Sequence, residues 1–282
     1  MTHGSTLEPS PVTVPHLNYN SAMANIDGGE ASSSEIQAVA RVGQICSLFG
    51  PHTAELSATD VAERLGLNRT TAYRYCASLV TAGILERGPR RGTFVLGGLM
   101  LQLGIHALSR RPVVELAPAY LSELSTALHM TAVLGLWGAQ GPVVALVQED
   151  ISRTVVVTVR TGSQLDSTAA QTRVFLAYLS DQHAIERMTT TLSPAERTEL
   201  EAAVYAARRT GYAIVGHSGG VFGAAVPVFD ENGICATVAV LGADQIANFS
   251  PGSPALQKLM DTAAALSDQL GGGQEGLRRA EL

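Results

Sequence analysis

Residues 56–85, which read LSATDVAERLGLNRTTAYRYCASLVTAGIL, constrain the fold of this chain more than any other stretch. Ser57 and Asn68 each precede a run whose apolar residues recur at three- and four-residue spacing, and both residue types are good helix N-caps. Asp60, three residues after Ser57, predicts a weak capping box. Gly66 lies between the two runs, where it can turn the chain. The stretch therefore predicts two short amphipathic helices joined by a tight turn, which is the pattern of a helix-turn-helix.

The second of these helices is expected to expose polar and cationic side chains. Ala72, Cys76 and Leu79 form its apolar stripe, so the remaining positions of its N-terminal half face outward. A recognition helix needs such side chains because the base edges in the major groove are read by hydrogen bonds. The predicted DNA-binding residues of the helix pair are Ser57, Asn68, Arg69, Thr70, Thr71, Tyr73 and Arg74.

A predicted hairpin follows the helix pair, with strands at 83–87 and 93–96 around the turn GPRRG at 88–92. A hairpin in this place is a wing, and Arg90 and Arg91 at its tip are predicted to contact phosphate or the minor groove. Residues 33–111 hold nine Arg and five acidic residues, a formal charge of +4, whereas 1–32 and 112–282 carry −3 and −7. The positive charge is thus confined to the block that holds the helix pair, which favours double-stranded DNA as the partner.

The whole chain is predicted to divide into five segments. These are a disordered tail at 1–32, a winged helix-turn-helix domain at 33–96, a linker helix at 97–111, a second domain at 112–271 and a flexible tail at 272–282. In the second domain we expect helices at 113–128, 168–180, 182–190, 194–210 and 254–270, and strands at 131–137, 142–149, 154–160, 221–229 and 233–241. Ser167 or Thr168 is the expected cap of the 168–180 helix. This pattern predicts an α+β fold with a mostly antiparallel sheet.

Composition argues against membrane, metal and cofactor proteins. No apolar run reaches the roughly 18 residues that cross a bilayer, and the N-terminus has no export signal, so we expect a cytoplasmic protein without a membrane partner. The three cysteines are far apart and are expected to be reduced and buried. The His and Cys residues lack metal-ligand spacing, and Lys258, the single lysine, is not in a Gly-rich phosphate loop. No metal and no cofactor are therefore expected.

One motif favours an enzyme. The segment GHSGG at 216–220 matches G-x-S-x-G, the nucleophile elbow of hydrolases. That elbow requires a helix after the serine, whereas residues 221–229 have a strand pattern. We therefore expect a protein that is not an enzyme, with a serine hydrolase that uses Ser218 as the remote alternative.

Four segments together resemble the IclR family of bacterial transcriptional regulators. They are the helix pair at 56–87, TFVLG at 93–97, RTGYAI at 209–214 and AVPVFDENGICATVAVLG at 225–242. The resemblance implies a winged helix-turn-helix, a linker helix that dimerises and a GAF-like effector-binding domain. It also implies homodimers or homotetramers on palindromic operators, acting as repressors or activators of catabolic operons under the control of a small organic acid. The alternative is a DNA-binding regulator whose C-terminal domain only oligomerises.

The resemblance also implies where an effector would bind. Family members often have H-A-[ST]-A-x-G-K-A at a helix N-terminus that receives the effector carboxylate, and residues 167–174 here read STAAQTRV. A pocket Asp of the family falls at Val215, a Cys at Gly223 and two Ser at Ala239 and Leu241, so polar positions have become apolar. An apolar effector such as an aromatic carboxylate is therefore expected, because buried polar groups without partners are unfavourable. The predicted effector-binding residues are Leu134, Ala169, Ala170, Gln171, Val215, Gly223, Ala239 and Leu241.

Overall fold

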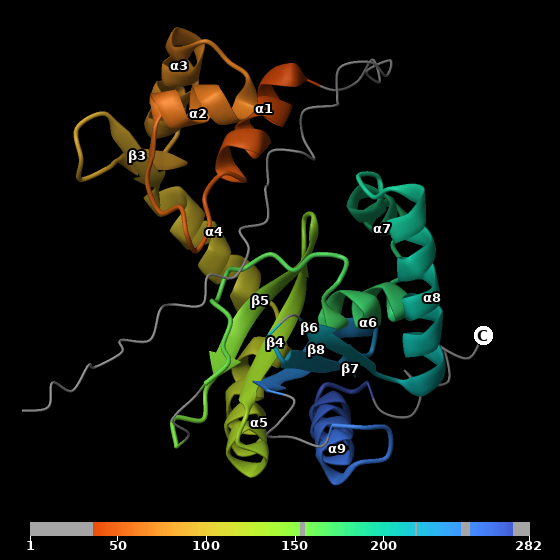
Figure 1. Ribbon diagram of the computed structural model, residues 1–282. Coiled ribbons are helices and arrows are strands. Elements are labelled where there is room, and N and C mark those ends of the chain that lie inside the picture. Colours follow the sequence, from red (N-terminus) through yellow and green to blue (C-terminus); the bar gives the residue numbers. More distant parts are fainter. Residues whose placement is uncertain (1–35, 153–155, 218, 244–248, 273–282) are drawn as a thin grey trace, which may run out of the picture.

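The computed structural model describes residues 36–152, 156–217, 219–243 and 249–272. The tail predicted at 1–32 lies outside these residues, as does all but the first residue of the tail predicted at 272–282. The N-terminal part forms α1 (Gln37–Cys46), β1 (Leu56–Ser57), α2 (Ala58–Leu65), α3 (Arg69–Thr81), β2 (Leu85–Arg87) and β3 (Thr93–Leu96). Helix α4 (Gly98–Ser109) then leads from this head into the second domain (Figure 1).

The head has its own hydrophobic core. Ile45, Leu85 and Phe94 are fully buried and pack with the inner stripe of α3, which consists of Ala72, Cys76 and Leu79. The wing is a three-stranded sheet of order β1-β3-β2, in which Leu56 pairs with Phe94. The sequence did not predict β1, because a strand of two residues has no periodicity to detect.

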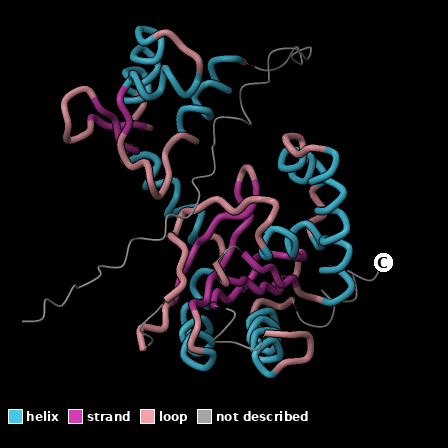
Figure 2. Tube along the Cα trace, in the orientation of Figure 1, coloured by secondary structure: helices cyan, strands magenta, loops and turns pink. Residues whose placement is uncertain are grey.

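The second domain is built on a five-stranded antiparallel sheet. Its elements are α5 (Pro112–Leu128), β4 (Thr131–Gly138), β5 (Gly141–Gln148), α6 (Ala170–Tyr178), α7 (Gln182–Thr189), α8 (Pro194–Thr210), β6 (Ala213–His217), β7 (Val221–Asp230), β8 (Gly233–Ala243) and α9 (Pro254–Gln269). The strand order is β5-β4-β8-β7-β6. Helices α5 and α9 cover one face of the sheet, and α6, backed by α8, covers the other (Figures 1 and 2). The predicted α+β fold with an antiparallel sheet is confirmed.

Side chains alternate between the two faces along each strand. On β4, Ala132 and Leu134 pack in the core with α5 and α9, whereas Val133 packs in the second core with α6. Gly135 lies on the α6 face as well, because a Cβ built on it would meet the side chain of Gln171 at 2.6 Å. The sheet therefore has two buried faces, and β4 contributes side chains to both of them.

Two local predictions for the second domain were wrong, and one strand was missed. Described residues 156–160 form no strand, and residues 163–165 instead bond to β5, with Leu165 donating its N–H to the Pro142 carbonyl at 2.8 Å. Strand β6 was not predicted. Neither Ser167 nor Thr168 caps α6: its N-cap is Ala169, and the Thr168 hydroxyl instead donates to Asp166 at 2.6 Å.

The described part of the chain has neither a membrane-spanning helix nor a metal-binding cluster. None of its helices is both long enough and apolar enough to cross a membrane. Nor does it contain a group of three or more His, Cys, Asp or Glu side chains that could hold a metal ion.

Candidate DNA-binding head and effector site

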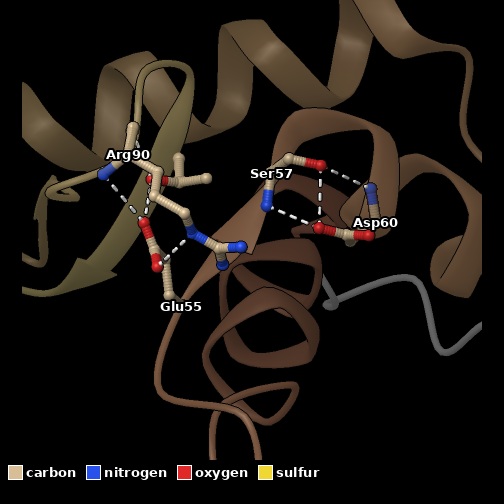
Figure 3. A network of polar contacts seen from close by, with 5 residues as sticks. Glu55, Ser57, Asp60 and Arg90 are labelled. Carbon is tan, nitrogen blue, oxygen red and sulfur yellow. Dashed lines mark hydrogen bonds and ion pairs between the residues drawn. The ribbon is translucent and has the colours of Figure 1, made fainter.

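The helix pair of the head is fixed by capping interactions. The Asp60 N–H donates to the Ser57 hydroxyl at 3.2 Å, and the Ser57 N–H donates back to the Asp60 carboxylate at 2.7 Å (Figure 3). This is a complete capping box, stronger than the weak form that the sequence indicated. The Asp60 carboxylate accepts from the Ser57 N–H and also from the Ser57 hydroxyl, and these two hydrogen bonds hold the pKa of Asp60 below its usual value. Gly66 ends α2 with a left-handed backbone, φ 63°.

Helix α3 exposes the side chains expected of a recognition helix. Asn68 caps it by accepting from the Thr71 N–H at 2.8 Å, so the side chains of Asn68 and Ser57 are both used within the head. Thr71 is half-buried. The predicted contact residues whose side chains point to solvent are Arg69, Thr70, Tyr73 and Arg74. The N-terminal half of α3 therefore offers donors and positive charge to a DNA groove.

Arg87 links the wing to the recognition helix, a contact the sequence did not reveal. Its guanidinium lies 5.0 Å from the centre of the Phe94 ring and 5.6 Å from that of Tyr73, and it donates to the Tyr73 hydroxyl at 3.3 Å. Cation–π contact of this kind holds a cation against aromatic rings. Tyr73 is thereby tied to strand β2, although half of its side-chain surface stays accessible.

The wing tip is anchored by Glu55 (Figure 3). Its carboxylate accepts from Arg90 Nε at 2.8 Å and from the Arg90 N–H at 3.2 Å, and it also accepts from the Thr93 hydroxyl. The hydrogen bond from Thr93, followed by those from Arg90, lowers the pKa of Glu55. Arg90 therefore anchors the wing through its ion pair with Glu55, although 73% of its side chain stays exposed, and Arg91 beside it is exposed as well.

The candidate effector site is an apolar row across three strands. Val215 on β6 pairs with Gly223 on β7, which pairs in turn with Leu241 on β8. Leu241 covers Gly223, because a Cβ built on that glycine would lie 3.3 Å from the Leu241 side chain. Ala170 and Ala239 belong to the same hydrophobic cluster. Five of the predicted effector-binding residues therefore lie on one face of the sheet, beside the first turn of α6.

Gln171 and Leu134 differ from each other in how they fit the predicted effector site. The buried Gln171 side chain donates to the Thr237 hydroxyl on β8 at 3.0 Å. The Gln171 backbone N–H lies in the first turn of α6, close to the N-cap Ala169, and is therefore left to bind a ligand. Leu134 faces the opposite core, between the sheet and helices α5 and α9. Its placement does not fit the predicted role in effector binding, because the sheet separates it from the other residues.

The G-x-S-x-G segment does not have the backbone context of a nucleophile elbow. Strand β6 ends at His217 and strand β7 begins at Val221, so the motif joins two strands. Ser218 itself lies outside the described residues. An elbow requires a strand followed by a helix.

A winged helix-turn-helix with an exposed recognition helix, joined by a helix to an α+β domain, defines a class of DNA-binding regulators. Two family models match this chain. The IclR helix-turn-helix domain matches residues 38–89, and the bacterial transcriptional regulator IclR C-terminal domain matches residues 105–268. The chain belongs to the IclR family of transcriptional regulators.

One curated relative and two solved structures are similar to this chain, and the structures show the same fold. The chain is 27% identical over 254 residues to the HTH-type transcriptional regulator XynR of Escherichia coli K12, covering 84% of this chain and 98% of the relative. An IclR regulator structure from Silicibacter has a TM-score of 0.73 at 21% identity, covering 84% of this chain and 97% of that one. An IclR homologue from Microbacterium hydrocarbonoxydans, complexed with 4-hydroxybenzoate, has a TM-score of 0.65 at 20% identity, covering 83% and 98%.

Proposed function

We propose that this protein regulates a catabolic operon, as a repressor or an activator, by binding a palindromic operator under the control of a small organic acid. The observation that carries the DNA-binding part is the exposed N-terminal half of α3, with Arg69, Thr70 and Arg74 accessible above a buried inner stripe. Arginine gives bidentate contacts to guanine, and Arg91 on the wing adds a contact to phosphate.

Helix α4 supports a homodimer or homotetramer. It exposes five large apolar side chains on a helix that has no buried residue, namely Leu99, Leu101, Leu103, Ile105 and Leu108. Apolar surface of this kind is favourable only when another surface covers it. A pair of heads held through α4 would present two recognition helices to the two halves of a palindrome.

The effector we propose is an aromatic carboxylate. The N–H groups of the first turn of α6 can receive a carboxylate, and the row of Val215, Gly223 and Leu241 offers an aromatic ring apolar contact. The structural relative complexed with 4-hydroxybenzoate supports this ligand class for the same fold. The protein would then act in the cytoplasm, without catalysis of its own.

A footprint on the intergenic region beside its own gene tests the regulatory proposal. We expect protection of two half-sites related by a palindrome, and a change in protection when an effector acid is added. Calorimetry with matched aromatic and aliphatic acids tests the ligand class. Binding of only the aliphatic acids would refute the aromatic carboxylate. If no acid changed operator affinity, the second domain would serve oligomerisation alone.

A further inference from the structure

Two of the buried side-chain atoms without a hydrogen-bond partner belong to residues beside the candidate effector site, whereas the third belongs to Arg173, whose guanidinium lies 3.8 Å from Glu199 on α8. In the described part of the chain there are three such atoms, namely the hydroxyls of Thr131 and Thr172 and Nε of Arg173. Thr172 and Arg173 belong to the first turn of α6, and Thr131 is the first residue of β4. Buried polar atoms almost always have partners, so an unpaired group needs an explanation such as a missing ligand.

Thr131 extends the apolar row by one strand. It pairs with Leu241, so the row runs from Val215 through Gly223 and Leu241 to Thr131. Side chains two residues apart on a strand point to the same face. Val133 packs with α6, and Thr131 therefore points to the α6 side as well. Thr131 is 2% exposed, so its hydroxyl is enclosed on that face.

The N-terminus of α6 is directed toward this row. At the C-terminal end of the helix, the Tyr178 ring lies 5.2 Å from that of Phe229, which pairs with Ile234 on β8. At its N-terminal end, Gln171 bonds to Thr237 on the same strand. The C-terminal end of α6 thus lies near position 234 of β8 and its N-terminal end lies near position 237. Leu241 lies farther along β8 in the same direction. The unpaired N–H groups of the first turn of α6 therefore point toward Leu241 and Thr131.

We infer that the Thr131 hydroxyl binds the effector, and that the effector is consequently an aromatic acid with a second hydrogen-bonding group, such as a hydroxybenzoate. In this arrangement the first turn of α6 holds the carboxylate and the ring lies over Leu241. The ring hydroxyl then reaches Thr131, one strand, or about 4.8 Å, away from Leu241. The inference rests on the proposed function and adds to it a residue that selects among aromatic acids.

The test uses the full-length protein and calorimetry with benzoate, 4-methylbenzoate, 3-hydroxybenzoate and 4-hydroxybenzoate. The wild type is expected to bind one hydroxybenzoate about tenfold more tightly than the acid without the hydroxyl, because a site built around a polar group rejects ligands that lack one. Thr131→Val keeps the side-chain shape and removes the hydroxyl, so that preference should disappear while benzoate binding stays within about twofold. Thr131→Ser keeps the hydroxyl and should retain the preference.

Operator binding without ligand serves as the control, because Thr131 lies outside the head. The wild-type measurement alone can overturn the inference: equal affinity for 4-methylbenzoate and both hydroxybenzoates would do so even if Thr131→Val failed to fold. Retention of the preference in Thr131→Val would also overturn it, while the aromatic class of effector would stand. Failure of the wild type to bind any of the four acids would remove the proposed effector class and this inference together.

Discussion

Replacing Gln171 by leucine should destabilise the second domain through a single buried hydrogen bond. Gln171 Nε2 donates to the Thr237 hydroxyl at 3.0 Å, with Gln171 6% exposed and Thr237 fully buried. The change leaves the Thr237 hydroxyl without this partner, and an unsatisfied buried group costs about 1–3 kcal/mol. Since 1 kcal/mol shifts the Tm of a domain of this size by about 2–4 °C, we expect Tm to fall by about 2–12 °C.

A double-mutant cycle separates this hydrogen bond from general packing effects. Thr237→Val leaves the Gln171 amide unpaired and should cost about as much as Gln171→Leu. The double variant replaces both partners by apolar groups, so its loss should be smaller than the sum of the single losses by about 0.5–3 kcal/mol. Gln257→Leu is the matched control, because the Gln257 amide donates to Asp261 at 2.8 Å on the protein surface and its loss should change stability by less than about 0.5 kcal/mol.

Thermal and urea unfolding, monitored by circular dichroism, measure all four variants. If Gln171→Leu and Thr237→Val each lost no more stability than Gln257→Leu, the reasoning would be refuted. Such a result would mean that the Thr237 hydroxyl finds water or another partner. Additive losses in the double variant would equally show that the two side chains do not interact. In either case α6 would be positioned by its apolar contacts alone.

Four further substitutions test the head, and one pH titration tests the loop after β5. Arg74→Ala should weaken operator binding by about 1–3 kcal/mol and relax specificity at one base pair, as measured by titration of mutated operators. Arg91→Ala should weaken all sequences alike and reduce the salt slope by about one unit, whereas Arg90→Ala should reduce it less because Arg90 is already paired with Glu55. Ser57→Ala should destabilise the head by about 1–2 kcal/mol in chemical unfolding, through loss of the capping box. Hydrogen bonds from the Ser152 N–H and then from His129 lower the pKa of Asp150 to about 2. Because the unfolded pKa is about 3.9, these hydrogen bonds should stabilise the fold above that pH, and the stabilisation should be lost as the pH falls toward 2. A midpoint near 4 in an NMR titration of this carboxyl group would contradict the prediction.

How far the sequence predicted the structure depended on how local each interaction is. The caps of α2 and α3 join residues three positions apart, Ser57 with Asp60 and Asn68 with Thr71, so they could be read from residue types in order. The anchor of the wing joins Glu55 to Arg90 and Thr93, 35 and 38 residues away. No periodicity encodes such a pair, because the folded wing alone brings these residues together.

In the candidate effector site, too, the sequence failed wherever the outcome depended on contacts between distant residues. The segment 131–137 reads TAVLGLW, which is apolar on both sides because helices cover both faces of the sheet, so the sequence could not assign Leu134 to the α5 face. The sequence also could not show that residues 156–160 form no strand whereas the five residues of β6 do. Only pairing with a neighbouring strand makes an apolar segment a strand, and β6 pairs with β7.

By itself, the sequence determined that this chain carries a winged helix-turn-helix with a cationic outer face, because capping, apolar spacing and charge are properties of residues close together in the chain. The tertiary structure decided which residues share a face of the sheet and where polar atoms are left without partners. It alone placed Thr131 at the end of the row of Val215, Gly223 and Leu241, on the side of the α6 N-terminus. Strand register and helix direction set these relations, and both are fixed by contacts between residues far apart in the chain.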